Sequence, residues 1–205
     1  IISVINQKGG VGKTTTVINL AAGLSMKDKK ILVIDLDPQG NATTGLGLSN
    51  TESSEQTIYS VLNGNRKVAE VIKKTKFENL DLITSNVDLS GLEVETAGDS
   101  RRAFMLKDEL TSYLNDSRAS YDYVLIDCPP SLSLLTIMAL VSSNSLVVPL
   151  QTEFFALEGL TQLMKTIDRI KTNLNPKLII KGILLTMYDK RNKLSSEVEK
   201  DSREY

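Results

Sequence analysis

The feature that most constrains this chain is a glycine-rich segment between an apolar run and an amphipathic run. Residues 8–15 read Lys-Gly-Gly-Val-Gly-Lys-Thr-Thr. Residues 1–5 before it are apolar enough for a buried strand, and residues 14–26 after it have apolar side chains at helical spacing. Glycines let the backbone approach phosphate oxygens and turn its N–H groups toward an anion, and the start of a helix adds its dipole. The segment therefore predicts a phosphate-binding loop in a strand–loop–helix unit.

The residues of this loop have separate expected roles. Lys13 is expected to contact the β- and γ-phosphates of a nucleotide, and the Thr14 hydroxyl to ligate Mg²⁺. The usual pattern G-x-x-x-x-G-K-[ST] places a glycine where this chain has Gln7. The alternative is a glycine-rich turn without a ligand, but the strand before it, the helix after it and the Lys-Thr pair favour the nucleotide loop. The expected nucleotide-binding residues are Lys8, Gly9, Gly10, Val11, Gly12, Lys13, Thr14 and Thr15.

Strand-length apolar runs alternate with helical segments along the rest of the chain. The expected strands are residues 1–5, 31–34, 80–83, 123–126, 146–148 and 179–185, and the expected helices are 14–26, 101–115, 133–142 and 157–173. Near-continuous apolar strands separated by helices are typical of a parallel sheet that is covered on both faces. We therefore predict an α/β fold with a twisted, mainly parallel sheet and helices on both faces. Ligands of such sheets bind at the carboxyl ends of the strands.

The extent of the chain is consistent with one domain over residues 1–205. It begins without Met inside an apolar strand and ends at Tyr205 in a charged stretch of helical spacing. We therefore expect truncation at both ends, chiefly at the carboxyl terminus. The polar residues 49–56 are expected to form a surface loop.

Composition excludes several kinds of chemistry. The chain has no histidine, which removes His-based general bases, Ser-His-Asp triads and His-ligated zinc. The single cysteine, Cys128, excludes an internal disulfide and a cysteine-rich metal site, and it is expected to be a buried small residue rather than a nucleophile. No apolar run reaches the roughly 18 to 20 residues of a membrane helix. We expect a cytoplasmic protein that has no membrane partner.

Three aspartates follow predicted strands and are candidates for the chemical site. Asp35 and Asp37 come after the second strand, and alternate residues of an extended segment face the same way, so both can point into the site. Asp127 ends an apolar strand, where its carboxylate would hold Mg²⁺ through water. Attack by water needs an oriented acceptor, and without histidine a carboxylate is the natural choice. The alternative for each aspartate is a turn or a helix cap.

Several motifs resemble one known family in chain order. Residues 6–15, Asn-Gln-Lys-Gly-Gly-Val-Gly-Lys-Thr-Thr, are similar to the deviant Walker A loop of the ParA/Soj/MinD group of P-loop NTPases. The resemblance continues through residues 35–43 (DLDPQGNAT), 127–130 (DCPP) and 153–159 (EFFALEG), so it covers essentially the whole chain. The Asn-Gln pair before the first lysine is similar to ParA/Soj partition proteins. Phe154 and Phe155 are expected to pack in the core rather than to form a stacking platform.

This resemblance implies roles that the residues alone do not establish. Lys8 would reach across a nucleotide-sandwich homodimer to the phosphates of the partner, Asp37 would position the attacking water, and Asp35 would lie in the outer shell of the Mg²⁺ ion. The implied protein is a DNA-partition ATPase with ATP and Mg²⁺ as cofactors. It would dimerise on ATP, bind DNA without sequence preference on the nucleoid, and hydrolyse ATP when a ParB-like centromere-binding partner stimulates it.

A basic stretch near the end of the chain is the candidate DNA-binding region. Residues 165–193 hold eight basic and two acidic residues, a net charge of +6 in a chain whose total is −1. Local basic charge is what non-specific DNA binding requires, although a solvated surface is the alternative. The segment 186–191, Thr-Met-Tyr-Asp-Lys-Arg, is similar to the Soj stretch that contacts DNA. Lys190 and Arg191 are therefore the expected DNA contacts.

Other functions remain open at this point. A MinD-like membrane-cycling ATPase would need an amphipathic helix at the carboxyl terminus, and Gln7 and the basic stretch argue against it. A non-catalytic, nucleotide-gated DNA scaffold would keep Lys13 but lose Asp37, and this chain has both. A P-loop kinase or ligase for a small molecule has no recognisable acceptor pocket here. The paired cysteines of an iron–sulfur reductase are absent.

Overall fold

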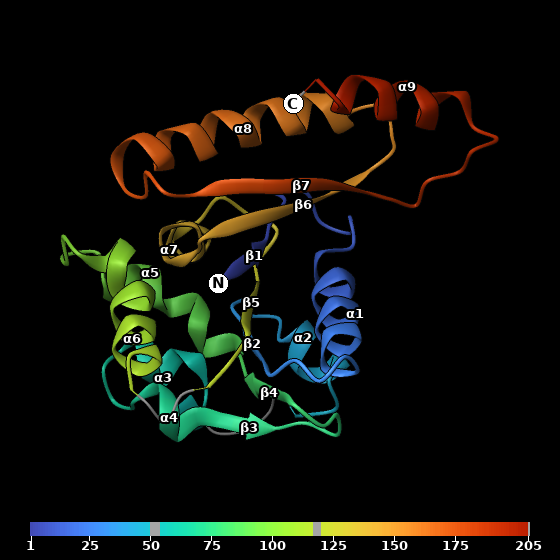
Figure 1. Ribbon diagram of the computed structural model, residues 1–205. Helices are drawn as coiled ribbons and strands as arrows, with labels where there is room; N and C mark the ends of the chain where they lie inside the picture. Colours follow the sequence, from blue (N-terminus) through green and yellow to red (C-terminus); the bar gives the residue numbers. More distant parts are fainter. Residues whose placement is uncertain (50–53, 117–119, 205) are drawn as a thin grey trace.

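The structure is a computed structural model that describes residues 1–49, 54–116 and 120–204. Within these residues, a seven-stranded sheet has the order β3-β4-β2-β5-β1-β6-β7 (Figure 1). Neighbouring strands are parallel except that β3 runs antiparallel to β4. The strands are Ile2–Val4 (β1), Ile31–Asp35 (β2), Ile72–Lys74 (β3), Leu80–Ile83 (β4), Tyr123–Asp127 (β5), Ser145–Gln151 (β6) and Ile179–Thr186 (β7).

Helices lie on both faces of this sheet, as predicted. The α-helices are Lys13–Ser25 (α1), Asn41–Gly45 (α2), Ile58–Leu62 (α3), Val68–Val71 (α4), Leu92–Glu95 (α5), Met105–Leu114 (α6), Leu134–Ser142 (α7), Ala156–Asn173 (α8) and Lys193–Ser202 (α9). Short 3₁₀ helices are Ser54–Gln56, Val87–Gly91 and Arg102–Phe104. Among the described residues, none of the helices combines the length and the apolarity that crossing a membrane requires.

The alternation of side chains along β2 shows how the two layers of the core are built. Leu32 and Ile34 pack with α3, α6 and α7 on one face, whereas Ile31 and Val33 pack with α1 on the other. Because all five β2 residues are buried, this strand lies between two layers of helices. The buried face of α8 packs on β6 in a further apolar cluster beside β7.

All six predicted strands are present, and their ends shift by at most three residues. The expected helix 101–115 begins with the 3₁₀ turn Arg102–Phe104 before α6 starts at Met105. Strand β3 was not predicted, because Ile72–Lys74 has only one apolar residue and lies at an exposed edge of the sheet. Of the expected surface loop 49–56, residues 50–53 lie outside the described residues, and Ser54–Gln56 is a 3₁₀ helix.

Candidate nucleotide-binding site

A cavity of about 420 Å³ brings the predicted phosphate loop together with one of the predicted aspartates. It lies where β1, β2, β5 and β7 end, at the carboxyl edge of the sheet, as expected for this class of fold. The lining residues are Gly9, Gly10, Gly12, Lys13, Thr14, Thr15, Asp37, Asn41, Pro130 and Met187. Asn41, Pro130 and Met187 were not predicted as site residues, although each belongs to or adjoins a motif that the sequence analysis quoted.

Two glycines allow the phosphate loop to take its shape. Gly10 has φ 74° and Gly12 has φ 91°, in the left-handed region that side chains disfavour. Gly12 is also the N-cap of α1, so the loop passes directly into the start of that helix. The positive end of the helix dipole therefore faces the cavity, where a phosphate would lie.

Side chains outside the cavity hold this loop in place. The Asn6 Nδ2 atom donates to the Pro149 carbonyl at 2.7 Å. The Thr186 hydroxyl at the end of β7 donates to the Val11 carbonyl at 2.9 Å. Val11 itself is buried and is not among the residues that line the cavity. The loop is therefore anchored to β6 and β7 by contacts within the chain.

Lys13 lies at the inner end of the loop with its charge largely removed from solvent. Its side chain is 7% exposed, and Nζ donates to the Lys8 carbonyl at 2.8 Å. Burial lowers the pKa of Lys13, and the nearby Asp127 carboxylate partly opposes this effect. A phosphate group would add negative charge next to this buried ammonium.

Asp127 is a fully buried carboxylate whose two oxygens make no hydrogen bond of ordinary geometry with the described residues. Burial and the neighbouring Asp35 charge raise the pKa of Asp127 to about 7. The Thr14 hydroxyl lies close enough to favour the ionised form. Among the described residues, no group of three or more carboxylates or thiols could hold a metal by itself. Thr14 and Asp127 therefore fit a magnesium ion that takes its remaining ligands from water and phosphate.

Asp35 is used mainly to shape the loop that follows β2. Its Oδ2 accepts from the Thr43 amide and from the Thr43 hydroxyl, each at 2.7 Å, and its Oδ1 accepts from the Asp37 amide at 3.2 Å. Burial raises the pKa of Asp35 to about 6, although these hydrogen bonds act in the other direction. Asp35 pairs in register with Asp127 but does not line the cavity.

Asp37 is the predicted aspartate that reaches the cavity. Its Oδ1 accepts from the Gln39 amide at 3.0 Å, and the residue is 6% exposed. One carboxylate oxygen is therefore held by the loop while the side chain lines the space next to Lys13. This is the geometry expected of a group that orients a small polar molecule beside a phosphate.

Lys8 lies outside the cavity, and the aromatic pair lies elsewhere than expected. The Lys8 ammonium forms an ion pair with Glu153, and its side chain is not part of the cavity lining. The prediction that Phe154 and Phe155 pack in the core is wrong, because they are 77% and 65% exposed. Both residues lie in the turn between β6 and α8. The first buried side chain of α8 is that of Ala156. Two adjacent aromatic residues in a sequence do not show whether the turn that carries them faces the core or the solvent.

Cys128 follows the interpretation made from the sequence. It is 1% exposed, and burial raises the pKa of its thiol. A thiol that resists ionisation is a poor nucleophile. Cys128 therefore belongs to the apolar cluster around α7.

The basic stretch does not form a single patch. The turn before β7 and the loop after it lie at opposite ends of this strand (Figure 1), roughly 26 Å apart at about 3.3 Å per residue. Lys190 and Arg191 lie exposed in the loop after β7, on the same edge of the sheet as the nucleotide cavity. The Arg191 guanidinium is bound by both oxygens of Asp189, at 3.0 and 2.8 Å. The predicted DNA contact is thus paired within its own loop.

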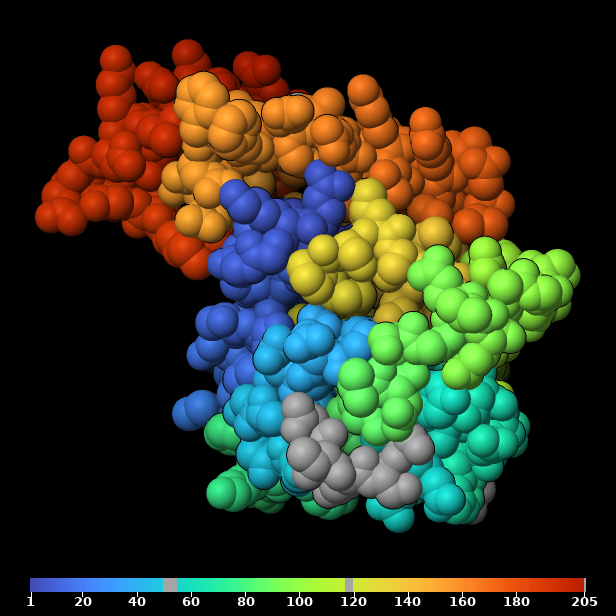
Figure 2. Space-filling view, turned by 180° about the vertical axis from the view of Figure 1, so that it is seen from behind, coloured from blue at the N-terminus to red at the C-terminus, as the bar shows by residue number. Residues whose placement is uncertain are grey.

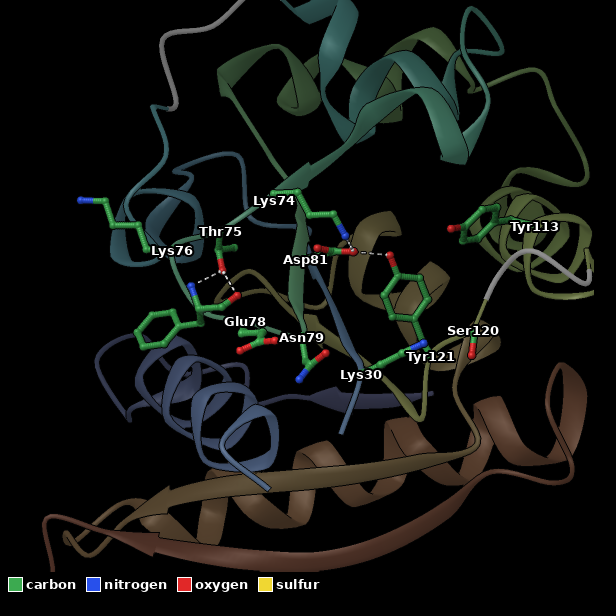
Figure 3. A pocket seen from close by; sticks show the side chains of 11 residues that line it. Lys30, Lys74, Thr75, Lys76, Glu78, Asn79, Asp81, Tyr113, Ser120 and Tyr121 are labelled. Atoms are coloured by element: carbon green, nitrogen blue, oxygen red, sulfur yellow. Dashed lines mark hydrogen bonds and ion pairs between the residues drawn. The ribbon is translucent and has the colours of Figure 1, made fainter. Parts of the chain in front are cut away.

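A larger cavity of about 630 Å³ lies at the opposite edge of the sheet, where the parallel strands β2 and β4 begin (Figure 3). There, Asp81 accepts hydrogen bonds from the Lys74 ammonium at 2.8 Å and from the Tyr121 hydroxyl at 2.7 Å. Burial and the bond to Asp81 raise the pKa of Tyr121. These contacts tie the edge strand β3 to β4 and to the segment before β5, which is a structural role.

Comparisons with known proteins agree with this geometry. A protein family described as an AAA domain matches residues 1–180. The chain is 50% identical over 203 residues to the chromosome partitioning protein ParA of Caulobacter vibrioides, covering 99% of this chain and 75% of the relative. It is 46% identical over 205 residues to the sporulation initiation inhibitor protein Soj of Bacillus subtilis, covering 100% of this chain and 79% of that protein.

A solved structure shows the same fold with nucleotide bound. Cobyrinic acid a,c-diamide synthase from Mycobacterium smegmatis, with a bound ATP analogue and magnesium, superimposes with a TM-score of 0.91 at 36% identity. The match covers 99% of this chain and 81% of that one. With its phosphate loop, its buried Asp127 and these relatives, the chain belongs to the ParA/Soj family of P-loop partition ATPases.

Proposed function

We propose that this protein binds ATP with Mg²⁺, dimerises in the ATP-bound state and hydrolyses ATP to ADP and phosphate. The observation that carries the proposal is the meeting of Lys13, Thr14 and Asp37 around one cavity, with the buried Asp127 carboxylate beside Thr14. Lys13 supplies a buried positive charge, and the other side chains supply the oxygens that a hydrated cation and a water molecule need.

Each residue has a distinct task in this mechanism. The loop amides and Lys13 bind the β- and γ-phosphates and compensate their charge. Thr14 and Asp127 hold Mg²⁺, which neutralises charge that develops on the phosphate oxygens. Asp37 accepts a hydrogen bond from the attacking water and orients it toward the γ-phosphorus. Asp35 keeps Asp37 in place through the bonds to Thr43 and to the Asp37 amide.

The partition function adds DNA and a protein partner to this cycle. Lys190 and Arg191 contact DNA phosphates, so binding is independent of sequence and the protein associates with the nucleoid in the cytoplasm. Dimerisation doubles these contacts on one duplex and makes DNA binding depend on ATP. A ParB-like centromere-binding protein stimulates hydrolysis, which returns monomers and releases DNA. The likeness to ParA and Soj over nearly the whole chain supports these steps.

The test is ATP turnover measured as phosphate release, with and without duplex DNA and a ParB-like protein. We expect slow turnover by the protein alone and faster turnover when both are present. Size-exclusion chromatography in ATP and in ADP measures the dimer in parallel. Nucleotide binding with no hydrolysis under any condition would favour the nucleotide-gated scaffold instead.

A further inference from the structure

The Lys8 side chain faces its own subunit. Its ammonium forms an ion pair with Glu153, the residue that follows Thr152 after the end of β6. The Lys8 side chain is 49% exposed and that of Glu153 is 29% exposed, and the Glu153 oxygen that meets the ammonium is itself buried. This pair lies beside the nucleotide cavity but outside its lining. The position is accessible to a second molecule that approaches the phosphate loop.

The backbone of Lys8 is fixed on both sides. Its amide donates to Asn6 Oδ1 at 3.0 Å, and its carbonyl accepts from Lys13 Nζ at 2.8 Å. The preceding residue, Gln7, donates from Nε2 to the Gly159 carbonyl of α8 at 3.2 Å. A change in the contact of the Lys8 ammonium therefore requires rotation of the side chain only, while the phosphate loop keeps its shape.

Glu153 is fixed in a similar way and stands next to exposed apolar surface. Its amide donates to the Gln151 carbonyl at 3.0 Å, and its carbonyl accepts from the Ala156 amide at 3.1 Å. Phe154 and Phe155 follow directly, with their rings edge to face at 5.0 Å. Figure 2 shows the start of α8, in light orange, against the blue amino-terminal segment that holds the phosphate loop. Exposed aromatic side chains beside a charged pair are typical of a surface that another protein covers.

We propose that Glu153 is a positioning residue that holds Lys8 on its own subunit until a second nucleotide-bound copy of this chain offers a phosphate in exchange. The inference rests on the proposed function, because it takes Lys8 as the group that reaches the partner's nucleotide. Glu153 then opposes dimerisation, since each subunit must break one ion pair before its Lys8 can cross. The exposed Phe154 and Phe155 rings are covered in the same step and favour the dimer.

The variant Glu153→Gln tests this directly, because it keeps the size of the side chain and removes its charge. Its dimer dissociation constant is measured by analytical ultracentrifugation with a non-hydrolysable ATP analogue and Mg²⁺. We expect the variant to dimerise about tenfold more tightly than the wild type, because two pairs break per dimer and a partly exposed pair contributes roughly a factor of three. Glu158→Gln, which removes the same charge in the first turn of α8, is the matched control and should leave the constant unchanged.

A double-variant cycle separates this role from a merely structural one. In a Lys8→Gln background, Glu153→Gln should have no further effect, because the contact that it breaks is already gone. A thermal melt and the nucleotide affinity of the monomer check that each variant is folded. Unchanged or weaker dimerisation of Glu153→Gln, or the same tightening without Lys8, would overturn the inference. If no variant and no wild-type protein dimerises with nucleotide, the proposed function fails first, and this inference fails with it.

Discussion

The sheet has an amino edge, where the parallel strands begin, and a carboxyl edge, where they end. Buried aspartates lie at both edges, and Asp81 and Asp127 differ in their hydrogen bonds. At the amino edge, Asp81 is 6% exposed and receives hydrogen bonds from Lys74 and Tyr121. At the carboxyl edge, Asp127 is fully buried and its oxygens have no such bonds within the described residues. The amino edge also has the larger cavity, about 630 Å³ against about 420 Å³.

In this contrast, a buried carboxylate that lacks hydrogen bonds, rather than the larger cavity, marks the edge that we propose binds the nucleotide. A buried carboxylate without a partner costs free energy, and a fold retains it where a ligand compensates the charge. The Asp81 cluster is already neutralised by groups of the same chain, so an added ligand would gain little there.

The largest difference in ATP affinity is expected between variants of two lysines, one at each edge of the sheet. Lys13→Ala removes the buried charge that compensates the triphosphate, so ATP affinity should fall roughly 1,000-fold or more. Lys74→Ala, at the amino edge, should leave ATP affinity unchanged. Titration with a fluorescent nucleotide measures both variants. Tight ATP binding by Lys13→Ala would show that this loop does not bind the phosphates of ATP as proposed.

At the carboxyl edge, a change at Asp37 should affect ATP hydrolysis but not ATP binding. Asp37→Ala loses the acceptor that orients water but keeps the loop and Lys13, so ATP should still bind and the dimer should persist. Turnover should fall by at least about 100-fold. Phosphate release under single-turnover conditions measures the loss, with size-exclusion chromatography as the binding control. An unchanged rate would assign the role to another residue.

The two buried aspartates should respond oppositely when their charge is removed. Asp127→Asn removes a buried carboxylate whose pKa is raised to about 7, which costs stability at pH 8, and the lost attraction to Lys13 offsets part of the gain. The free energy of unfolding of the ligand-free protein should therefore rise by about 1 kcal/mol. Asp81→Asn breaks a pair whose lysine is largely exposed, so it should lower that free energy by about 1 kcal/mol. Urea denaturation at pH 8 without nucleotide or Mg²⁺ gives both values. Shifts of the same sign would contradict the comparison.

The smallest change, in DNA affinity, is expected for variants in the loop after β7 that carries Arg191. Arg191→Ala should weaken binding to all sequences alike and flatten the slope of log K against log salt by about one unit per subunit. Asp189→Asn frees the Arg191 guanidinium from its bidentate partner, so DNA affinity should rise about two- to fivefold. Mobility shifts on two unrelated duplexes at several salt concentrations test both. Weaker binding by Asp189→Asn would show that this pair shapes the loop for DNA.

Local patterns in the sequence were enough to predict the centre of the fold. The six parallel strands contain mostly apolar runs, so all six were identified even though β7 is largely exposed. The apolar spacing from Thr14 onward predicted α1 to within one residue of its start. Asp37 was expected in the site because it follows a buried strand by two residues, and it does line the cavity. These features depend on neighbours in the chain, which a sequence displays directly.

Features that depend on contacts between distant segments were not predictable in this way. The antiparallel edge strand β3 has a single apolar residue and is defined only by its pairing with β4. Glu153 is 145 positions from Lys8, so their ion pair follows from the placement of β6 beside β1. The exposure of Phe154 and Phe155 likewise follows from the direction in which the turn before α8 leaves the sheet.

The three hydrogen bonds of Asp35 have a consequence for the motions of the ligand-free protein. Because Thr43 is bound through both its amide and its hydroxyl, the amide proton of Thr43 can exchange with solvent only when this contact opens. The loop that carries Asp37 is therefore held in one conformation before ATP arrives, and its ordering is part of folding rather than of ligand association. Slow deuterium exchange at Thr43 would record that order in the absence of any nucleotide.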